Sequence, residues 1–185
     1  EYIMQPSYIV KSKTFTYETK CRLHFVTITS DVERFVNESG IHAGTITLQT
    51  PHTTAGLWLK EAEKNLIGSE EELGYRPDLK RIIDRFADPA EAYHHNDVCS
   101  SSNPNGKRNT HLCKPDENGI IPECLNGHAH AHNMLLPSTL TMIIENGVLC
   151  RGVWQQVLLV ELDRDRIRKV TMLVQGETNK ASTGS

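Results

Sequence analysis

The dipeptide Asn146-Gly147 constrains the fold of this chain more than any other feature, because it is the strongest short signal for a two-residue β-hairpin turn. We predict one strand on each side of it, over residues 138–144 and 148–156. Residues 157–163 follow as a further strand, which begins as an almost wholly apolar run typical of a central strand. After a charged turn, residues 167–175 form the last predicted strand. The final third of the chain is therefore predicted to be a run of closely connected strands.

The first half of the chain adds strands of a different pattern. Residues 8–19 alternate apolar and polar side chains, which indicates a strand with one buried face. Residues 22–29 are predicted to form a second strand. Residues 44–50 are rich in threonine and isoleucine, which favour strands.

Two helices are predicted between these strands. The first begins with the capping box Ser30-x-x-Glu33 and ends at Gly40. The second begins near Pro77 and ends before Asp88-Pro89. Because strands and helices do not alternate regularly, we expect an α+β fold, a mixed or antiparallel β-sandwich with two or three helices.

A chain of 185 residues is long enough for one sizeable core, and it shows no internal repeat. We therefore predict a single domain over residues 1–180. The segment at about 97–126 is rich in Ser, Asn, Pro and Gly and is expected to be a long loop insertion. Residues 181–185 are expected to be a disordered tail.

The overall charge and the cysteine pattern bear on partners and location. A net charge of −3 provides no basic face for nucleic acid or for an anionic membrane. No apolar run approaches the roughly 20 residues that span a bilayer. No secretion signal is apparent, and five irregularly spaced cysteines do not suggest a disulfide framework. We expect a cytoplasmic protein.

Histidines occur in three segments that lie where the chain is predicted to turn, namely 51–56, 93–97 and 126–132. Imidazole is the commonest metal ligand in proteins, and three histidines plus a water molecule form an open, catalytic type of zinc site. If residues 126–132 are extended, alternate histidines would line one wall of such a site. The alternative is that each histidine is an ordinary surface or core residue.

The charged segment 161–169 permits two interpretations. Arg166 and Arg168 could hold a phosphate or a carboxylate through paired hydrogen bonds, while Glu161 orients a ligand histidine or acts as a base. The alternative is a solvated turn whose charges compensate one another.

The cysteines suggest a separate possibility. Cys99, Cys113 and Cys124, together with His128, could form a structural zinc site, although this spacing matches no common zinc module. Cys21 and Cys150 are predicted to be small buried apolar residues.

Several of these segments, taken in order, resemble motifs of the YjbQ family over about residues 8–176. The matching motifs are Pro51-His52-Thr53-Thr54-Ala55-Gly56, Tyr93-x-His95-Asn96, Asn126-Gly127-His128-Ala129-His130, Leu136-Pro137-Ser138, Asn146-Gly147, Gly152-Val153-Trp154-Gln155, and Glu161-x-Asp163 with Arg166-x-Arg168.

The resemblance implies a compact α+β sandwich that assembles as a homotrimer. It also implies zinc or another divalent metal, bound by His52, His95 and His130. Members of the family have been linked to a weak thiamine-phosphate synthase activity, a transfer that joins a pyrimidine pyrophosphate to a thiazole phosphate and releases pyrophosphate.

On this basis each candidate residue is given an expected role. The catalytic candidates are His128 and Glu161 for proton transfer and Thr53 beside the substrate. The residues expected to bind the substrate, a small phosphorylated metabolite, are Thr54, Asp163, Arg166 and Arg168.

The sequence departs from the family pattern in the long loop, and at Pro137 and Val153, where the family usually has Gly and Thr. The departure leaves two alternatives to the synthase. One is a metal-dependent hydrolase of a small phosphorylated or lactone-like metabolite. The other is a non-enzymatic, trimeric metal-binding or interaction protein that uses the loop as its contact surface.

Overall fold

The computed structural model describes residues 7–97, 105–106 and 114–178. Its strands are β1 (Tyr8–Glu18), β2 (Phe25–Thr27), β3 (Ile41–Gln49), β4 (Ala55–Glu61), β5 (Thr139–Glu145), β6 (Val148–Leu149), β7 (Gln155–Glu161) and β8 (Ile167–Thr178). Its α-helices are α1 (Thr29–Ser39), α2 (Lys64–Ile67), α3 (Glu70–Leu73), α4 (Asp78–Phe86) and α5 (Gly127–Asn133). Short 3₁₀ turns cover η1 (His94–Asn96) and η3 (Pro122–Cys124).

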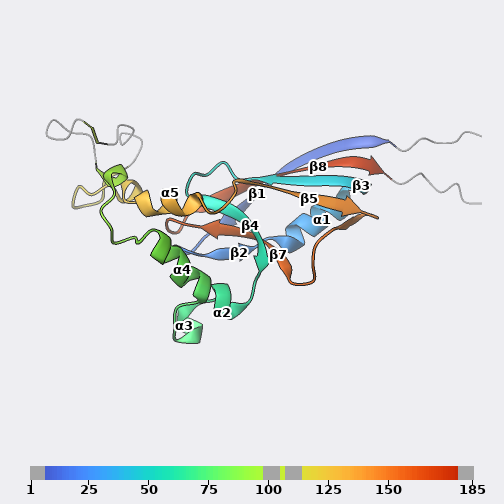
Figure 1. The fold of residues 1–185 in the computed structure, drawn as a ribbon. Helices are drawn as coiled ribbons and strands as arrows, with labels where there is room; N and C mark the ends of the chain where they lie inside the picture. The colour runs from blue at the N-terminus through green and yellow to red at the C-terminus, as the bar shows by residue number, and fades with distance from the viewer. Residues whose placement is uncertain (1–6, 98–104, 107–113, 179–185) are drawn as a thin grey trace, which may run out of the picture.

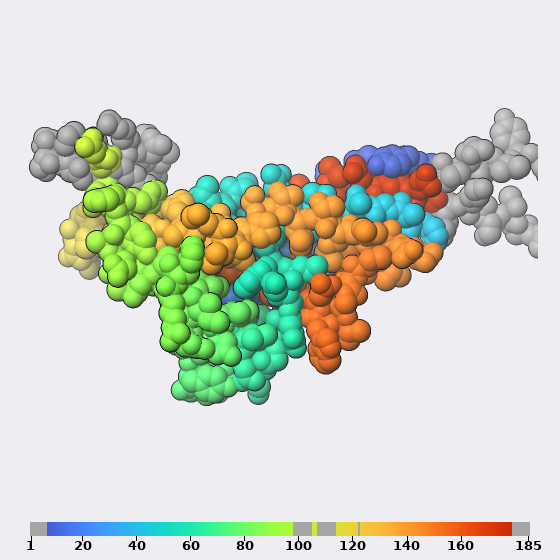
Figure 2. Space-filling model, in the orientation of Figure 1, coloured from blue at the N-terminus to red at the C-terminus, as the bar shows by residue number. Residues whose placement is uncertain are grey.

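Two antiparallel sheets pack face to face (Figure 1). The larger has the strand order β1-β8-β3-β5-β6, and the smaller has the order β2-β7-β4. Helices α2 to α4 lie on the other side of the small sheet and form a protrusion from the molecule (Figure 2). The predicted α+β sandwich is confirmed, and every strand pair in the described residues is antiparallel.

Strand β7 lies in the middle of these layers and is buried on both faces, as its apolar sequence predicts. Val157 and Leu159 point into the core between the two sheets, where they join α1. Leu158 and Val160 point the other way, into a second core under α4 and α5. Burying such a side chain contributes about 1.5–3 kcal/mol, so β7 couples the two layers.

Helix α1 forms where it was predicted, but the predicted capping box is wrong. Ser30 lies inside the helix, and the N-cap residue is Ile28, with no side-chain cap. The hydroxyl of Thr29 instead accepts a hydrogen bond of 2.9 Å from the backbone N–H of Val157, so this helix start is anchored to β7. Gly40 ends the helix in a left-handed conformation, as predicted.

The hairpin prediction at Asn146-Gly147 is confirmed. Both residues have positive φ, and Glu145 pairs with Val148 across the turn. The predicted strand 148–156 is wrong, because β6 ends at Leu149 and β7 begins only at Gln155. Between them the side chain of Gln155 accepts the backbone N–H of Gly152, at 2.7 Å, and closes a turn.

The largest correction concerns residues 127–133, which form helix α5 and are not extended. The described residues contain five α-helices, more than the two or three predicted, although α2 and α3 are single turns. In the part of the chain that the structure covers, no helix has the length and apolar character needed to cross a membrane. Cys21 and Cys150 were predicted to be buried and are exposed.

The predicted loop at about 97–126 is described only in part, at residues 97, 105–106 and 114–126. Cys99 and Cys113 lie outside the described residues, so the predicted cysteine zinc site does too. Cys124 is described and is buried at the end of η3, before α5 begins.

Candidate functional site

The site is built on a buried ion pair where β7 turns into β8. Glu161 is fully buried, and its two oxygens accept bonds of 2.6 and 2.5 Å from Nε and Nη2 of Arg168. Thr19 donates to the same carboxylate, and Thr54 accepts from Arg168 Nη2 at 2.9 Å. Among the described residues, the backbone N–H of Asp163 also donates to this carboxylate, at 2.9 Å. Glu161 holds Arg168 in place and is not positioned to serve as the base that the sequence suggested.

A second arginine is held by a similar device in the turn itself. Asp163 is nearly buried, and its Oδ2 accepts bonds of 3.1 and 2.6 Å from Nε and Nη2 of Arg166. Burial alone would lower the pKa of Arg166, but the hydrogen bond and charge of Asp163 raise it above its usual value. Asp163, predicted to touch the substrate, instead positions Arg166.

His52 lies beside this pair of arginines, at the end of β3. Its Nε2 accepts a hydrogen bond of 2.9 Å from the backbone N–H of Lys169. Burial lowers the pKa of His52, and the positive charge of Arg168 lowers it further, so the ring is neutral at pH 7. Because Nε2 is the acceptor, the single proton of the neutral ring is on Nδ1, which becomes a hydrogen-bond donor.

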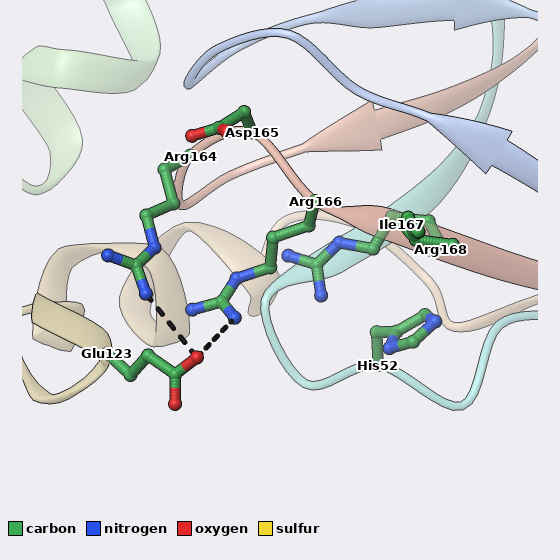
Figure 3. A pocket seen from close by; sticks show the side chains of 7 residues that line it. All are labelled: His52, Glu123, Arg164, Asp165, Arg166, Ile167 and Arg168. Carbon is green, nitrogen blue, oxygen red and sulfur yellow. Dashed lines mark hydrogen bonds and ion pairs between the residues drawn. The ribbon is translucent and has the colours of Figure 1, made fainter. Parts of the chain in front are cut away.

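These side chains open onto a pocket of about 570 Å³ (Figure 3). The lining residues are His52, Glu123, Arg164, Asp165, Arg166, Ile167 and Arg168. Figure 3 shows the three guanidinium groups in a row, with His52 beyond Arg168 and the carboxylate of Asp165 turned away from them. We call this cavity the arginine pocket.

One acidic side chain from the long loop reaches into the arginine pocket. Oε1 of Glu123 lies 3.5 Å from a nitrogen of Arg164 and 3.5 Å from a nitrogen of Arg166. These contacts are long for charge-assisted hydrogen bonds, which are usually 2.7–2.9 Å. A carboxylate oxygen thus lies between two guanidinium groups, which is the environment that an oxygen of a bound phosphate would seek.

The predicted metal ligands are brought together only in part. The rings of His95 and His130 lie against each other, with 4.4 Å between their centroids. A three-histidine site also needs His52, but Nε2 of His52 is engaged by Lys169 and its Nδ1 carries the ring proton. In residues 7–97, 105–106 and 114–178 no three His, Cys, Asp or Glu side chains are grouped to hold a metal ion. The predicted triad does not fit in this arrangement.

Three other candidates, His128, Thr53 and Thr54, do not line the arginine pocket. His128 is buried on α5, next to His132 and Tyr93, so it faces the helix layer. Because residues 127–133 form a helix, His128 and His130, which are two residues apart, lie on different helical faces. His128 and His132, which are four residues apart, share a face. Thr53 is exposed, and Thr54 is buried against Arg168.

Sequence reasoning gave no role to four lining residues, Glu123, Arg164, Asp165 and Ile167. Arg164 could have been found, because it lies in the same charged segment as Arg166 and Arg168. Glu123 carries no local signal, because only the folded loop brings it to the arginines.

A family model described as "UPF0047 protein YjbQ-like" matches residues 13–177 of the chain. A UPF0047 protein of Archaeoglobus fulgidus is 26% identical over 155 residues, covering 84% of this chain and 94% of its own length. The UPF0047 protein YugU of Bacillus subtilis is 27% identical over 164 residues, covering 89% of this chain and 98% of its own.

Solved structures agree with this match. A YbjQ-like protein of unknown function from Sulfolobus solfataricus superimposes with a TM-score of 0.68 at 26% identity, covering 92% of this chain and all of that one. A hypothetical protein from Aeropyrum pernix gives a TM-score of 0.64 at 25% identity, covering 90% and 99%. The sequence match and the shared fold together show that this chain belongs to the YjbQ-like UPF0047 family.

Proposed function

We propose that the arginine pocket binds the phosphate group of a small phosphorylated metabolite and that the chain is an enzyme acting on it. The observation that carries this proposal is the way in which two arginines are held. Each gives Nε and Nη2 to a buried or nearly buried carboxylate. Each therefore keeps its third nitrogen, Nη1, for the pocket.

Held in this way, the two guanidinium groups lose little conformational entropy when an anion binds. Nη1 of Arg168 makes no hydrogen bond within the described part of the chain, and Nη1 of Arg166 makes only the long contact to Glu123. A phosphate has several acceptor oxygens and can engage both nitrogens and Arg164. The Nδ1–H of His52 supplies a further, uncharged donor on the same side (Figure 3).

This arrangement suits reactions in which negative charge develops on a phosphate or pyrophosphate. Fixed cationic donors stabilise such charge in the transition state without having to reorganise. Two reaction classes meet the description: a transferase that releases pyrophosphate, as in thiamine-phosphate synthesis, and a hydrolase of a phosphate ester. The transferase is the first to test because members of the resembled family are linked to it.

The direct test is calorimetric titration of the full chain with inorganic phosphate and with pyrophosphate, for wild type and Glu123→Gln. The substitution removes the carboxylate charge between Arg164 and Arg166, so we expect phosphate to bind more tightly. A partly exposed charge contributes about 1 kcal/mol, which is roughly a fivefold change in Kd.

Glu91→Gln is the matched control, because Glu91 is exposed and lies outside the arginine pocket. We expect its affinity for phosphate to equal that of wild type. An equal gain in phosphate affinity in Glu123→Gln and Glu91→Gln would show that phosphate responds only to the overall charge of the protein. Weaker binding by Glu123→Gln would show that Glu123 supports the anion and does not compete with it.

Turnover should then be measured with a panel of phosphate esters and pyrophosphates, beginning with a pyrimidine pyrophosphate plus a thiazole phosphate and following pyrophosphate release. Release that requires both substrates would support the transferase, and phosphate release from one ester would support the hydrolase. Phosphate binding without turnover on any member of the panel would contradict the enzymatic part of the proposal and favour a binding protein.

Zinc content gives a separate prediction. We propose that His95 and His130 supply the ligands for any bound zinc and that His52 does not, since its Nε2 is held by Lys169. We expect chelator-washed protein to lose zinc in His95→Ala and His130→Ala and to keep it in His52→Ala, as measured by metal analysis per subunit. Equal loss in all three variants would restore the three-histidine site. Wild type without retained zinc would contradict metal binding altogether.

A further inference from the structure

A second cavity, of about 750 Å³, lies apart from the arginine pocket, between the β1–β2 connection and helices α3 and α4. Cys21, His24 and Phe25 line it from one side and Glu70 from another. Lys80, on α4, completes the wall. A cysteine, a histidine and a lysine therefore line one partly open cavity that the proposed phosphate chemistry does not use.

Lys80 is the unusual member of this group, because only 9% of it is exposed. Lysine is almost never so deeply buried unless it is paired. Within the described ranges, Lys80 makes no hydrogen bond or ion pair, although its amine borders the cavity.

Glu71 and Glu72 also line the cavity, while two other nearby acids, Asp84 and Glu70, are paired with arginines. Asp84 binds Arg22 at 2.5 Å and also pairs with Arg76. Glu70 pairs with the same Arg76. Burial lowers the pKa of Lys80 and the charges of Arg76 and Arg22 lower it further, while Cys21 and Glu70 act in the opposite direction. The neutral amine is therefore more populated than on a surface lysine.

We propose that Lys80 is a nucleophilic amine that forms an imine with a small aldehyde or ketone bound in this cavity. The lone pair of Nζ attacks the carbonyl carbon, which forms the C–N bond and a carbinolamine. The carbinolamine oxygen takes up both protons of the neutral Nζ in turn, by exchange through water, and leaves as water, while the nitrogen lone pair forms the C=N double bond of a neutral imine. The step needs no oxidant, reductant or cofactor, and a desolvated lysine is the usual residue for it.

The proposal is tested on the full chain at pH 7 with pyridoxal as the probe, borohydride reduction and peptide mass spectrometry. We expect Lys80 to be the most heavily labelled lysine in wild type and its label to be lost in Lys80→Arg. Lys64→Arg is the matched control, because Lys64 is an exposed lysine of the neighbouring helix α2. Its substitution should leave the labelling of Lys80 unchanged. Labelling of Lys80 no greater than that of Lys64 in wild type would overturn the proposal.

Two further measurements keep the result interpretable. Cys21 is exposed and lines the same cavity, so its alkylation with iodoacetamide should reduce imine formation at Lys80, and unchanged labelling would contradict a shared cavity. Lys80→Met should unfold at the same temperature as wild type or above it, because Lys80 makes no hydrogen bond or ion pair within the described residues that the substitution would remove. A clear fall in Tm would show that Lys80 is a structural anchor and not a free nucleophile.

Discussion

Glu161→Leu is expected to lower the free energy of unfolding by about 3–5 kcal/mol, the largest effect of any single substitution considered for this chain. In the described structure, Glu161 is the only carboxylate that forms an ion pair with Arg168. Without it, the positive charge of Arg168 stays buried and unpaired, because only 4% of this residue is exposed. The change also removes one acceptor of the hydroxyl of Thr19, which keeps the carbonyl oxygen of Arg166 within 3.0 Å. Urea unfolding followed by circular dichroism measures the loss.

A double variant separates the ion pair from simple packing. Glu161→Leu with Arg168→Met removes both charges, so we expect it to recover a large part of the stability lost in the single variant. Glu38→Gln is the surface control: Glu38 lies 3.9 Å from Arg34 in an exposed pair, and its loss should cost less than about 1 kcal/mol. A single variant as stable as wild type would show that Arg168 finds another partner or reaches solvent.

Arg166→Met is expected to weaken the binding of inorganic phosphate by roughly 10- to 150-fold. A hydrogen bond to a charged group contributes about 1.5–3 kcal/mol, and Arg166 presents its Nη1 from a position fixed by Asp163. The Kd comes from the same calorimetric titration. Asp163→Asn should weaken binding less, because it loosens the guanidinium group without removing it.

The control for this prediction is Arg81→Met. Arg81 is an exposed arginine paired with Asp78 on α4, outside the arginine pocket. Its substitution removes the same charge from the protein and should leave the Kd for phosphate unchanged. If both arginine variants weaken binding equally, phosphate responds to overall charge and the pocket is not its site. If neither does, the proposed phosphate site is wrong.

The strands and turns of this fold could be predicted because their signals are local. Asn146-Gly147 forms the hairpin because both residues accept positive φ at little cost. The apolar run of β7 predicts a strand buried on both faces, and β7 is packed between two cores. The failed capping box at Ser30 shows the limit: the hydrogen bond between Thr29 and Val157 moved the helix start, and 128 residues separate these partners.

The sequence singled out the charged segment as a possible phosphate site because arginines can hold a phosphate through paired hydrogen bonds, but a solvated turn was an open alternative. The partner of each arginine was not predictable in the same way. From the sequence, Glu161 was expected to transfer protons and Asp163 to bind the substrate. In the structure, Glu161 accepts hydrogen bonds from Arg168, and Asp163 accepts them from Arg166.

What the sequence determined by itself is the family, the α+β sandwich and the presence of histidine and arginine groups, because these depend on motifs, periodicity and turn chemistry. The tertiary structure decided the rest. It folded residues 127–133 into a helix that turns His128 away from His130, brought Glu123 to the arginines, and buried Lys80 with no ion-pair partner among the residues it describes. The physical reason is that burial and pairing depend on groups far apart in the chain, and a sequence pattern records only neighbours.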